Sequence, residues 1–468
     1  MQIPILNGIY ADSVADYRTS YPINLIPVPK QTGVSEGYLR TAPGIESFST
    51  GQGIDRGGIN WNNVMYRVSG SNLIKVDSSG VVTVLGEIAG SLDVAMIYSF
   101  DDLGICADGV AYLYNESVGL RQITDADLGS VFDVVWIDGY WIYTDGEFLI
   151  QSELSDPSSF VTTKYGSSES DPDPITGVMK LRNELYALNR YTIEVFQNVG
   201  GNNFAFQRIN GALVNVGCVG YRAKDYIADG IAVIGSPKNS PLGVYYVEGA
   251  NSAKISTREI DQIIATYTEE ELAQSANVAN VILDSHDFLF VYLPRHTMVW
   301  DKAASEAAQQ PVWFFLTSDI DFETPYRGTN PTYCYNKWIF GDTQGSNIGN
   351  WTFKKNTQYG NTIGWRFDTQ FLYGESRGFI MHSMELVGLP GKSVLGTDPV
   401  IFSSYTKDGV TWSDEKLVST GKTGEYNKRM VWRRLGASRL YRGIRFRGAD
   451  TNIIAFARLE AEIEALNG

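Results

Sequence analysis

A short apolar, aromatic-rich segment, a polar or glycine turn and a second such segment recur together seven times in this sequence. The first segments begin at residues 64, 103, 141, 184, 231, 289 and 338, so the repeats are 38 to 58 residues apart. Each pair of segments predicts a β-hairpin. Repeats of roughly 40–50 residues are typical of β-propellers, in which each blade is a small four-stranded sheet. We therefore predict a propeller of six or seven blades, with each hairpin in the middle of a blade.

The composition favours strands and tight turns over helices. The chain has 47 Gly and 27 Tyr among its 468 residues, and aromatic residues make up 12%. Aromatic residues favour strands, whereas glycine favours turns. The repeats carry neither a WD nor a kelch signature, so an irregular all-β sandwich is the alternative to a propeller. Both predictions place the chain in the all-β class.

The repeats occupy only part of the chain. A helical insertion is predicted near 256–276, where Thr268 and Glu271 have the spacing of a capping box. The last hundred residues alternate apolar and polar positions without the blade period, which predicts a separate sandwich. We predict three regions, which are an extended N-terminal arm over 1–50, the propeller over 51–360 and a C-terminal β-sandwich over 361–468.

The sequence offers no basis for a cofactor or a metal site. Cys106, Cys218 and Cys334 are isolated and odd in number, so neither a disulfide framework nor a metal site is expected, and we predict assembly in the cytosol. No glycine-rich phosphate loop precedes a helix, so no nucleotide cofactor is predicted. We see no signal peptide, and no apolar run reaches the roughly 18 residues that a membrane-spanning segment needs.

Groups suited to catalysis are scarce. The three histidines are His286, His296 and His382. Asp284, Ser285 and His286 are consecutive, but on a strand Ser285 would point to the opposite face from the other two. A triad needs a serine that is hydrogen-bonded to the histidine, so this trio is not expected to form one. We predict no catalytic residues and no enzymatic activity.

Residues 404–412, with the sequence SYTKDGVTW, resemble the Asp-box hairpin of sialidases and other propeller glycosidases. The aspartate is shifted in spacing, and the motif occurs once, outside the repeats. Asp408 is expected to cap the turn and Trp412 to pack, so the motif implies a structural role. A propeller glycosidase would also need paired carboxylates in a pocket, and it is kept as an alternative function.

Charge is spread unevenly along the chain. The net charge is −15, of which residues 1–360 carry −18 and residues 361–468 carry +3. The most acidic stretch, 101–174, holds 15 Asp and Glu against one Arg and one Lys. Such a surface repels nucleic acid.

The sharpest charge feature is a basic cluster near the C-terminus. It lies within 20 residues that contain no acidic residue, and it comprises Lys428, Arg429, Arg433, Arg434, Arg439, Arg442, Arg445 and Arg447. A nucleic-acid groove is one interpretation, because aromatic residues are interleaved with the arginines. We favour a subunit or partner interface with an acidic protein surface, such as the propeller of a neighbouring copy.

Nine short motifs, which occur in a shared order, resemble the packaged-DNA stabilisation protein, or tail hub, of short-tailed bacteriophages. The motifs are Gly37–Arg40, Pro43–Ile45, Tyr66–Val68, Thr192–Glu194, Tyr267–Glu270, Asp284–His286, Leu293–His296, Tyr326–Gly328 and Trp432–Gly436. The resemblance implies a structural protein of the virion tail that assembles in the host cytoplasm. It implies a homohexameric ring, attached below the portal and its adaptor, that retains packaged DNA and later conducts it. The implied partners are the adaptor, a tail needle or plug, tailspikes or fibres, and double-stranded DNA in passage.

A DNA channel would need a wall to which phosphates do not stick. Carboxylates meet this need, because Lys and Arg would bind phosphate and add affinity. Four acidic residues lie beside the predicted strand 131–137, and we predict that Asp125, Asp127, Asp133 and Asp138 line the channel. The alternative is that they face solvent or a spike-binding site. A host-receptor or glycan-binding tail protein is kept as an alternative function of the whole chain.

Overall fold

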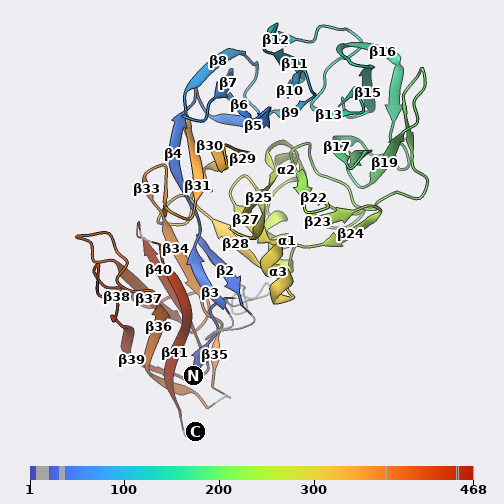
Figure 1. The fold of residues 1–468 in the computed structure, drawn as a ribbon. Coiled ribbons are helices and arrows are strands. Elements are labelled where there is room, and N and C mark those ends of the chain that lie inside the picture. The colour runs from blue at the N-terminus through green and yellow to red at the C-terminus, as the bar shows by residue number, and fades with distance from the viewer. Residues whose placement is uncertain (7–20, 31–36, 375–376, 450, 452, 467–468) are drawn as a thin grey trace.

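The computed structural model of the chain describes residues 1–468 apart from 7–20, 31–36, 375–376, 450, 452 and 467–468. It shows a ring of small sheets joined to a second β-domain, near which both termini lie (Figure 1). The predicted all-β class is confirmed. The predicted propeller and sandwich are confirmed as well.

The ring consists, among the residues described, of seven blades; the strands run outward in chain order in six of them, and in the seventh the outer strand comes from the start of the chain. In order from blade one to blade seven, the strands are β5 (Asp55–Trp61), β6 (Val64–Ser69), β7 (Asn72–Val76) and β8 (Val82–Glu87); β9 (Ala95–Tyr98), β10 (Leu103–Ala107), β11 (Val110–Asn115) and β12 (Gly119–Gln122); β13 (Asp133–Ile137), β14 (Tyr140–Thr144), β15 (Phe148–Glu153) and β16 (Asp156–Ser167); β17 (Ile175–Leu181), β18 (Glu184–Asn189), β19 (Ile193–Asn198) and β20 (Phe206–Arg208); β21 (Lys224–Ile227), β22 (Gly230–Gly235), β23 (Gly243–Glu248) and β24 (Asn251–Lys254); β25 (Asn277–Leu283), β26 (His286–Tyr292), β27 (Thr297–Asp301) and β28 (Trp313–Leu316); β29 (Gly328–Cys334), β30 (Lys337–Asp342), β31 (Asn347–Thr352) and β4 (Gly44–Thr50).

Each of the seven predicted hairpins forms the second and third strands of a blade. These strands are apolar on both faces because blades pack against each other, and every residue of β22 is buried. Asp-Gly turns help to join the strands of two blades. Asp108 and Gly109 connect β10 to β11, and Asp138 and Gly139 connect β13 to β14, with positive φ at all four residues. Two-residue turns of this kind match the twist of the hairpin.

The last blade closes the ring with a strand from the start of the chain. Strand β4 pairs antiparallel with β31, so that Ile45 lies opposite Trp351. Ile45 is fully buried and packs in the same core as Phe340. The short strands β32 (Thr357–Gln358) and β33 (Asn361–Thr362) extend this sheet. The closure joins segments about 300 residues apart by main-chain hydrogen bonds.

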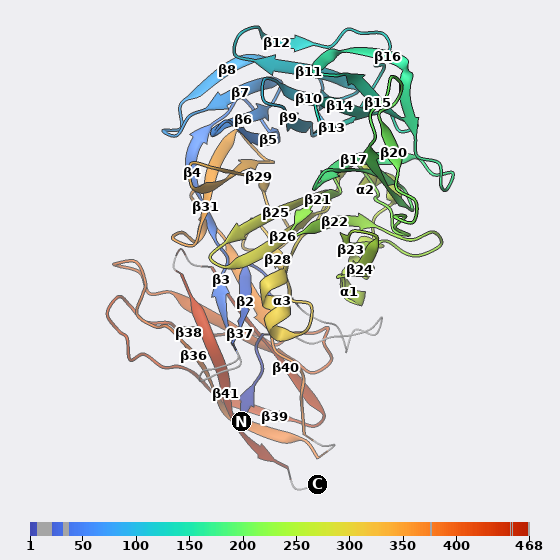
Figure 2. The ribbon, with the colours of Figure 1, turned by 45° about the vertical axis from the view of Figure 1, so that its right-hand side comes forward.

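The second domain is a sandwich of two antiparallel sheets (Figure 2). Its core includes Trp365, Phe367, Phe446 and Phe456, and the ring centroids of Phe367 and Phe446 lie 5.1 Å apart. One sheet contains β1 (Gln2–Ile3), β2 (Leu25–Pro29), β3 (Gly37–Thr41), β41 (Ala455–Ala465), β36 (Phe379–Gly388) and β39 (Met430–Ser438). The other contains β34 (Gly364–Asp368), β35 (Leu372–Tyr373), β40 (Tyr441–Ala449), β37 (Val400–Thr406) and β38 (Lys416–Ser419).

The segment 1–50, for which an extended arm was predicted, therefore supplies β1, β2 and β3 to the sandwich and β4 to the propeller. Leu39 of β3 lies opposite Phe456 of β41. Because one short segment contributes main-chain pairs to both domains, it links their folds directly.

Three short helices lie between the strands of the propeller. Helices α1 (Arg258–Ile264) and α2 (Glu269–Ser275) follow β24, and α3 (Lys302–Ala308) joins β27 to β28. The capping box predicted at Thr268 and Glu271 is confirmed at the start of α2. Helix α3 was not predicted, and it begins where the Asp301 carboxylate accepts a hydrogen bond from the Ala304 N–H.

Candidate functional site

The predicted basic cluster divides between buried and exposed arginines. Arg442 is 1% exposed, donates to the Leu435 carbonyl at 2.9 Å and lies over the ring of Tyr405. Arg445 forms two 2.8 Å hydrogen bonds with Asp368 and lies 3.7 Å from the ring centroid of Trp412. These two arginines are therefore part of the sandwich's own packing.

Three other members of the cluster pair with carboxylates at the surface. The partners are Glu425 for Lys428, Glu385 for Arg429 and Glu415 for Arg447. Arg433, Arg434 and Arg439 are exposed, and their side chains form no ion pair with any residue in the described part of the chain. These three guanidinium groups are the members of the cluster that are exposed and have no carboxylate partner among the described residues.

The four acidic residues proposed from the sequence also differ in their surroundings. Asp133 is 4% exposed, lies 2.7 Å from the Lys224 ammonium and accepts a hydrogen bond from the Val178 N–H. Asp138 accepts a hydrogen bond from the Asn198 amide at 2.9 Å.

Asp125 and Asp127 lie in the connection between blades two and three. Asp125 accepts hydrogen bonds from the backbone N–H groups of Asp127 and Phe160. Asp127 is half-buried. The prediction that these residues line a DNA channel stays a prediction.

A cavity of about 240 Å³ lies on the axis of the propeller. Residues from the first strand of every blade line it, which is where the axis of a propeller runs. Its polar walls include the Asp133–Lys224 pair, Arg222 and Asp225. Burial raises the pKa of Asp225 to about 6, although two backbone N–H groups and two nearby cations oppose the shift.

Asp284, Ser285 and His286, which are consecutive in the sequence, do not form a catalytic triad. The first two are turn residues with φ of 54° and 66°, which corrects the expectation that all three lie on a strand. Asp284 pairs with Arg40, and the His286 ring lies 2.5 Å from Asp301. Within the described ranges, no group of three or more His, Cys, Asp or Glu could hold a metal ion.

The Asp-box hairpin has the structural role predicted for it. Asp408 accepts hydrogen bonds from the Thr411 hydroxyl and from the backbone N–H groups of Val410 and Thr411, and these bonds lower its pKa. Trp412 packs on Arg445. Asp408 therefore stabilises the turn, and Trp412 is part of the packing of the sandwich.

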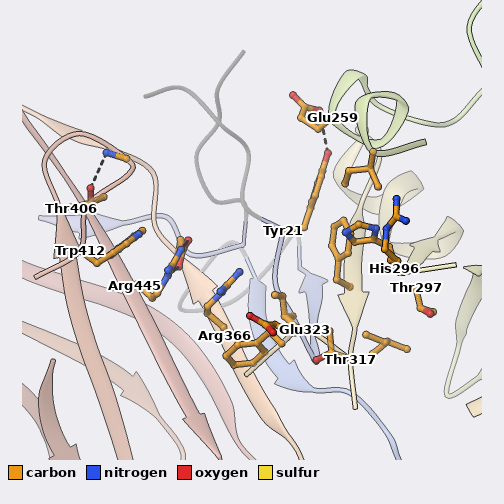
Figure 3. Close-up of a pocket in the computed structure, with 18 of the residues that line it drawn as sticks. Tyr21, Glu259, His296, Thr297, Thr317, Glu323, Arg366, Thr406, Trp412 and Arg445 are labelled. Carbon is orange, nitrogen blue, oxygen red and sulfur yellow. Dashed lines mark hydrogen bonds and ion pairs between the residues drawn. The ribbon is translucent and has the colours of Figure 1, made fainter. Parts of the chain in front are cut away.

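A larger cleft, of about 660 Å³, lies between the propeller and the sandwich (Figure 3). The sandwich contributes Arg366, Arg445 and Trp412 to it, and the propeller contributes His296 and Phe315. The sequence did not single out Arg366, which lies 62 positions before the basic cluster. Only the contact between domains reveals that this arginine faces a cleft.

Exposed aromatic residues on one face of the propeller were also missed. Phe100 is 83% exposed and packs edge-on against Trp136, and Tyr333 packs against Trp338. Phe100 lies in the turn between β9 and β10, and Tyr333 lies near the end of β29, which places both where the first strand of a blade turns into the second. Exposed apolar surface of this kind often marks an interaction site.

Two family models together match nearly the whole chain. One, described as the β-propeller of bacteriophage P22 Gp10, matches residues 1–356, and the other, described as the β-sandwich of the same protein, matches residues 364–464. The chain belongs to the bacteriophage P22 Gp10 family.

The tail hub protein gp10 of Salmonella phage P22 is 28% identical to this chain over 484 aligned positions, which cover 99% of each sequence. Membership of the P22 Gp10 family makes this chain a structural component of a phage tail, as the sequence resemblance implied. It also indicates a structural rather than a catalytic role. In the described part of the chain, no helix is long and apolar enough to cross a membrane.

Solved structures add little to the P22 Gp10 assignment. The WD40 domain of Neurospora crassa Pan2 is 7% identical and covers 66% of this chain and 96% of its own, with a TM-score of 0.42. The N-terminal domain of Nup159 is 10% identical and covers 69% and 98%, with a TM-score of 0.41. Such scores carry no argument about function.

Proposed function

We propose that this chain forms the ring-shaped tail hub of its virion. In this role, six copies attach below the portal and its adaptor, retain the packaged DNA and conduct it at ejection. The observation that carries the proposal is the similarity to a tail hub protein, which covers 99% of this chain and extends over both domains. A closed ring requires two different surfaces on each subunit that fit one another, and the uneven charge of the chain is consistent with this need.

Electron microscopy of the purified protein mixed with a portal–adaptor complex tests the proposal. We expect a closed ring of six copies on the adaptor. Sedimentation with and without the adaptor provides a second measurement. A chain that stays monomeric in both samples would contradict the proposal.

We further propose that part of the acidic stretch 101–174 lines the DNA path. Asp127 offers the cleanest test, because its side chain forms no hydrogen bond with the described residues, whereas Asp125 holds a turn. Repulsion of phosphate acts over about 8 Å at physiological salt, so only residues close to the DNA matter. Asp127→Lys is expected to slow genome ejection from virions that assemble normally. Ejection at the wild-type rate would remove Asp127 from the wall.

The remaining alternatives were a propeller glycosidase and a receptor- or glycan-binding tail protein. No observation in the described residues favours either over the tail hub, because Asp408 and Trp412 serve their own hairpin. Assay of the purified protein on host polysaccharide tests the glycosidase directly. Turnover that disappears when one carboxylate is replaced would contradict the structural role.

A further inference from the structure

Three arginines meet on two paired strands of the sandwich, at its border with the propeller. Arg366 of β34 lies opposite Arg447 of β40, and Asp368 lies opposite Arg445. Arg445 is neutralised by Asp368, and Arg447 is neutralised by Glu415, with contacts of 2.5 and 2.7 Å. Two carboxylates therefore serve three guanidinium groups.

Arg366 is the one of these three arginines that has no carboxylate partner among the described residues. Its side chain forms neither an ion pair nor a hydrogen bond with any described residue, and its guanidinium carbon lies 5.1 Å from the ring centroid of Phe322. Burial lowers its pKa to about 10, and the nearby Arg445 and Arg447 lower it further than Asp368 raises it. A partly buried charge without an ion-pair partner costs folding free energy. Such conflicts between a residue and its surroundings are typical of binding sites.

The cleft that Arg366 faces suits a peptide better than a nucleic acid. Aromatic side chains from both domains line it, with Phe371 from the sandwich and Phe315 and Phe322 from the propeller. Glu259 and Glu323 also line it, and they would repel a run of phosphates. Figure 3 shows Arg366 and Glu323 near each other, although they form no ion pair. A ligand with one carboxylate, flanked by apolar side chains, would pair with the Arg366 guanidinium and pack against the aromatic lining of the cleft.

We propose that this cleft binds an acidic peptide segment of a partner protein, whose carboxylate pairs with Arg366 and whose apolar side chains pack on the aromatic walls. Arginine and carboxylate form two parallel hydrogen bonds, which fixes the orientation of the bound segment. The inference goes beyond the tail hub role and does not require a ring, because the cleft lies within one subunit.

Titration of the full-length chain into a fluorescein-labelled peptide that carries one Glu flanked by Phe residues, followed by fluorescence anisotropy, tests the proposal. A charge-assisted hydrogen bond contributes roughly 1.5–3 kcal/mol, so Arg366→Met should weaken binding by about tenfold or more. Arg366→Lys, which keeps the charge, should bind more tightly than Arg366→Met. Lys422→Met, an exposed change outside the cleft, should bind like the wild type.

Thermal unfolding of the same variants separates binding from structure. Arg366→Met should raise the unfolding midpoint, because it removes a partly buried charge that has no ion pair with a described residue, whereas Arg445→Met should lower it, because it removes the ion pair of Arg445 with Asp368. Ring formation is measured separately by microscopy, so its failure would not affect this result. The proposal is overturned if wild type and Arg366→Met bind the peptide equally or not at all, if a duplex DNA probe binds with the same dependence on Arg366, or if Arg366→Met unfolds before the wild type.

Discussion

Asp133 and Lys224 form a buried ion pair between blades three and five, with side chains 5% and 8% exposed. Removing one partner of such a pair leaves a buried charge and typically costs about 3–5 kcal/mol. We therefore expect Asp133→Ala to lower the free energy of unfolding by about that amount, as measured by urea denaturation. Asp127→Ala, at a half-buried site without an ion pair, should change it by less than about 0.5 kcal/mol. Equal effects of the two changes would argue against a structural role for Asp133.

Asp225 predicts a pH dependence of stability. Its pKa is raised to about 6 by burial, from 3.8 when exposed, so the folded chain holds this proton at pH values where the unfolded chain has lost it. Stability therefore falls as pH rises from about 4 to about 6, because the unfolded state binds fewer protons. Unfolding of wild type and Asp225→Asn across this range provides the measurement. The difference in stability should shift in favour of the variant as pH rises, and parallel curves would contradict the prediction.

Among the secondary-structure elements, β4 is the strand that closes the propeller ring, so a change in its core residue should destabilise the fold. Ile45 is fully buried between the last blade and its neighbours, and its replacement by alanine leaves a cavity. Ile45→Ala should lower the free energy of unfolding by about 2–5 kcal/mol. Glu46→Ala, the next residue on the same strand, removes a half-exposed ion pair with Lys355 and should cost less than about 1 kcal/mol. Guanidinium denaturation of both variants decides whether this strand closes the ring.

At the scale of the whole molecule, we predict that the exposed arginines of the sandwich bind an acidic protein surface, such as the propeller of a neighbouring copy. Arg433→Ala with Arg434→Ala should leave the unfolding midpoint of the isolated chain almost unchanged, because both side chains are exposed. The same double variant should impair assembly of the tail, as measured by its incorporation into virions. Lys422→Ala serves as the control. Tight, salt-sensitive DNA binding that disappears in the double variant would instead favour a nucleic-acid groove.

The sequence by itself determined the local features of this protein. The seven hairpins, the capping box at Thr268 and the turn at Asp408 depend on residues within a few positions of one another. Alternation, turn chemistry and capping act over these short distances, so pattern alone was enough to predict them. The family resemblance added the role in the tail, because motif order is also a property of the sequence.

Only the tertiary structure decided which distant groups meet. Strand β4 pairs with β31, Leu39 lies opposite Phe456, and Asp133 meets Lys224 from 91 positions away. The basic cluster divided because strand alternation sent Arg442 inward, while the positive φ of Arg434 lies where the pairing of β39 shifts register. Arg366 was missed for the same reason, since whether an arginine finds a carboxylate depends on strand register and domain contact. Strand register and domain contacts are set by packing across the whole chain, because the pattern of one strand is compatible with pairing to many other strands.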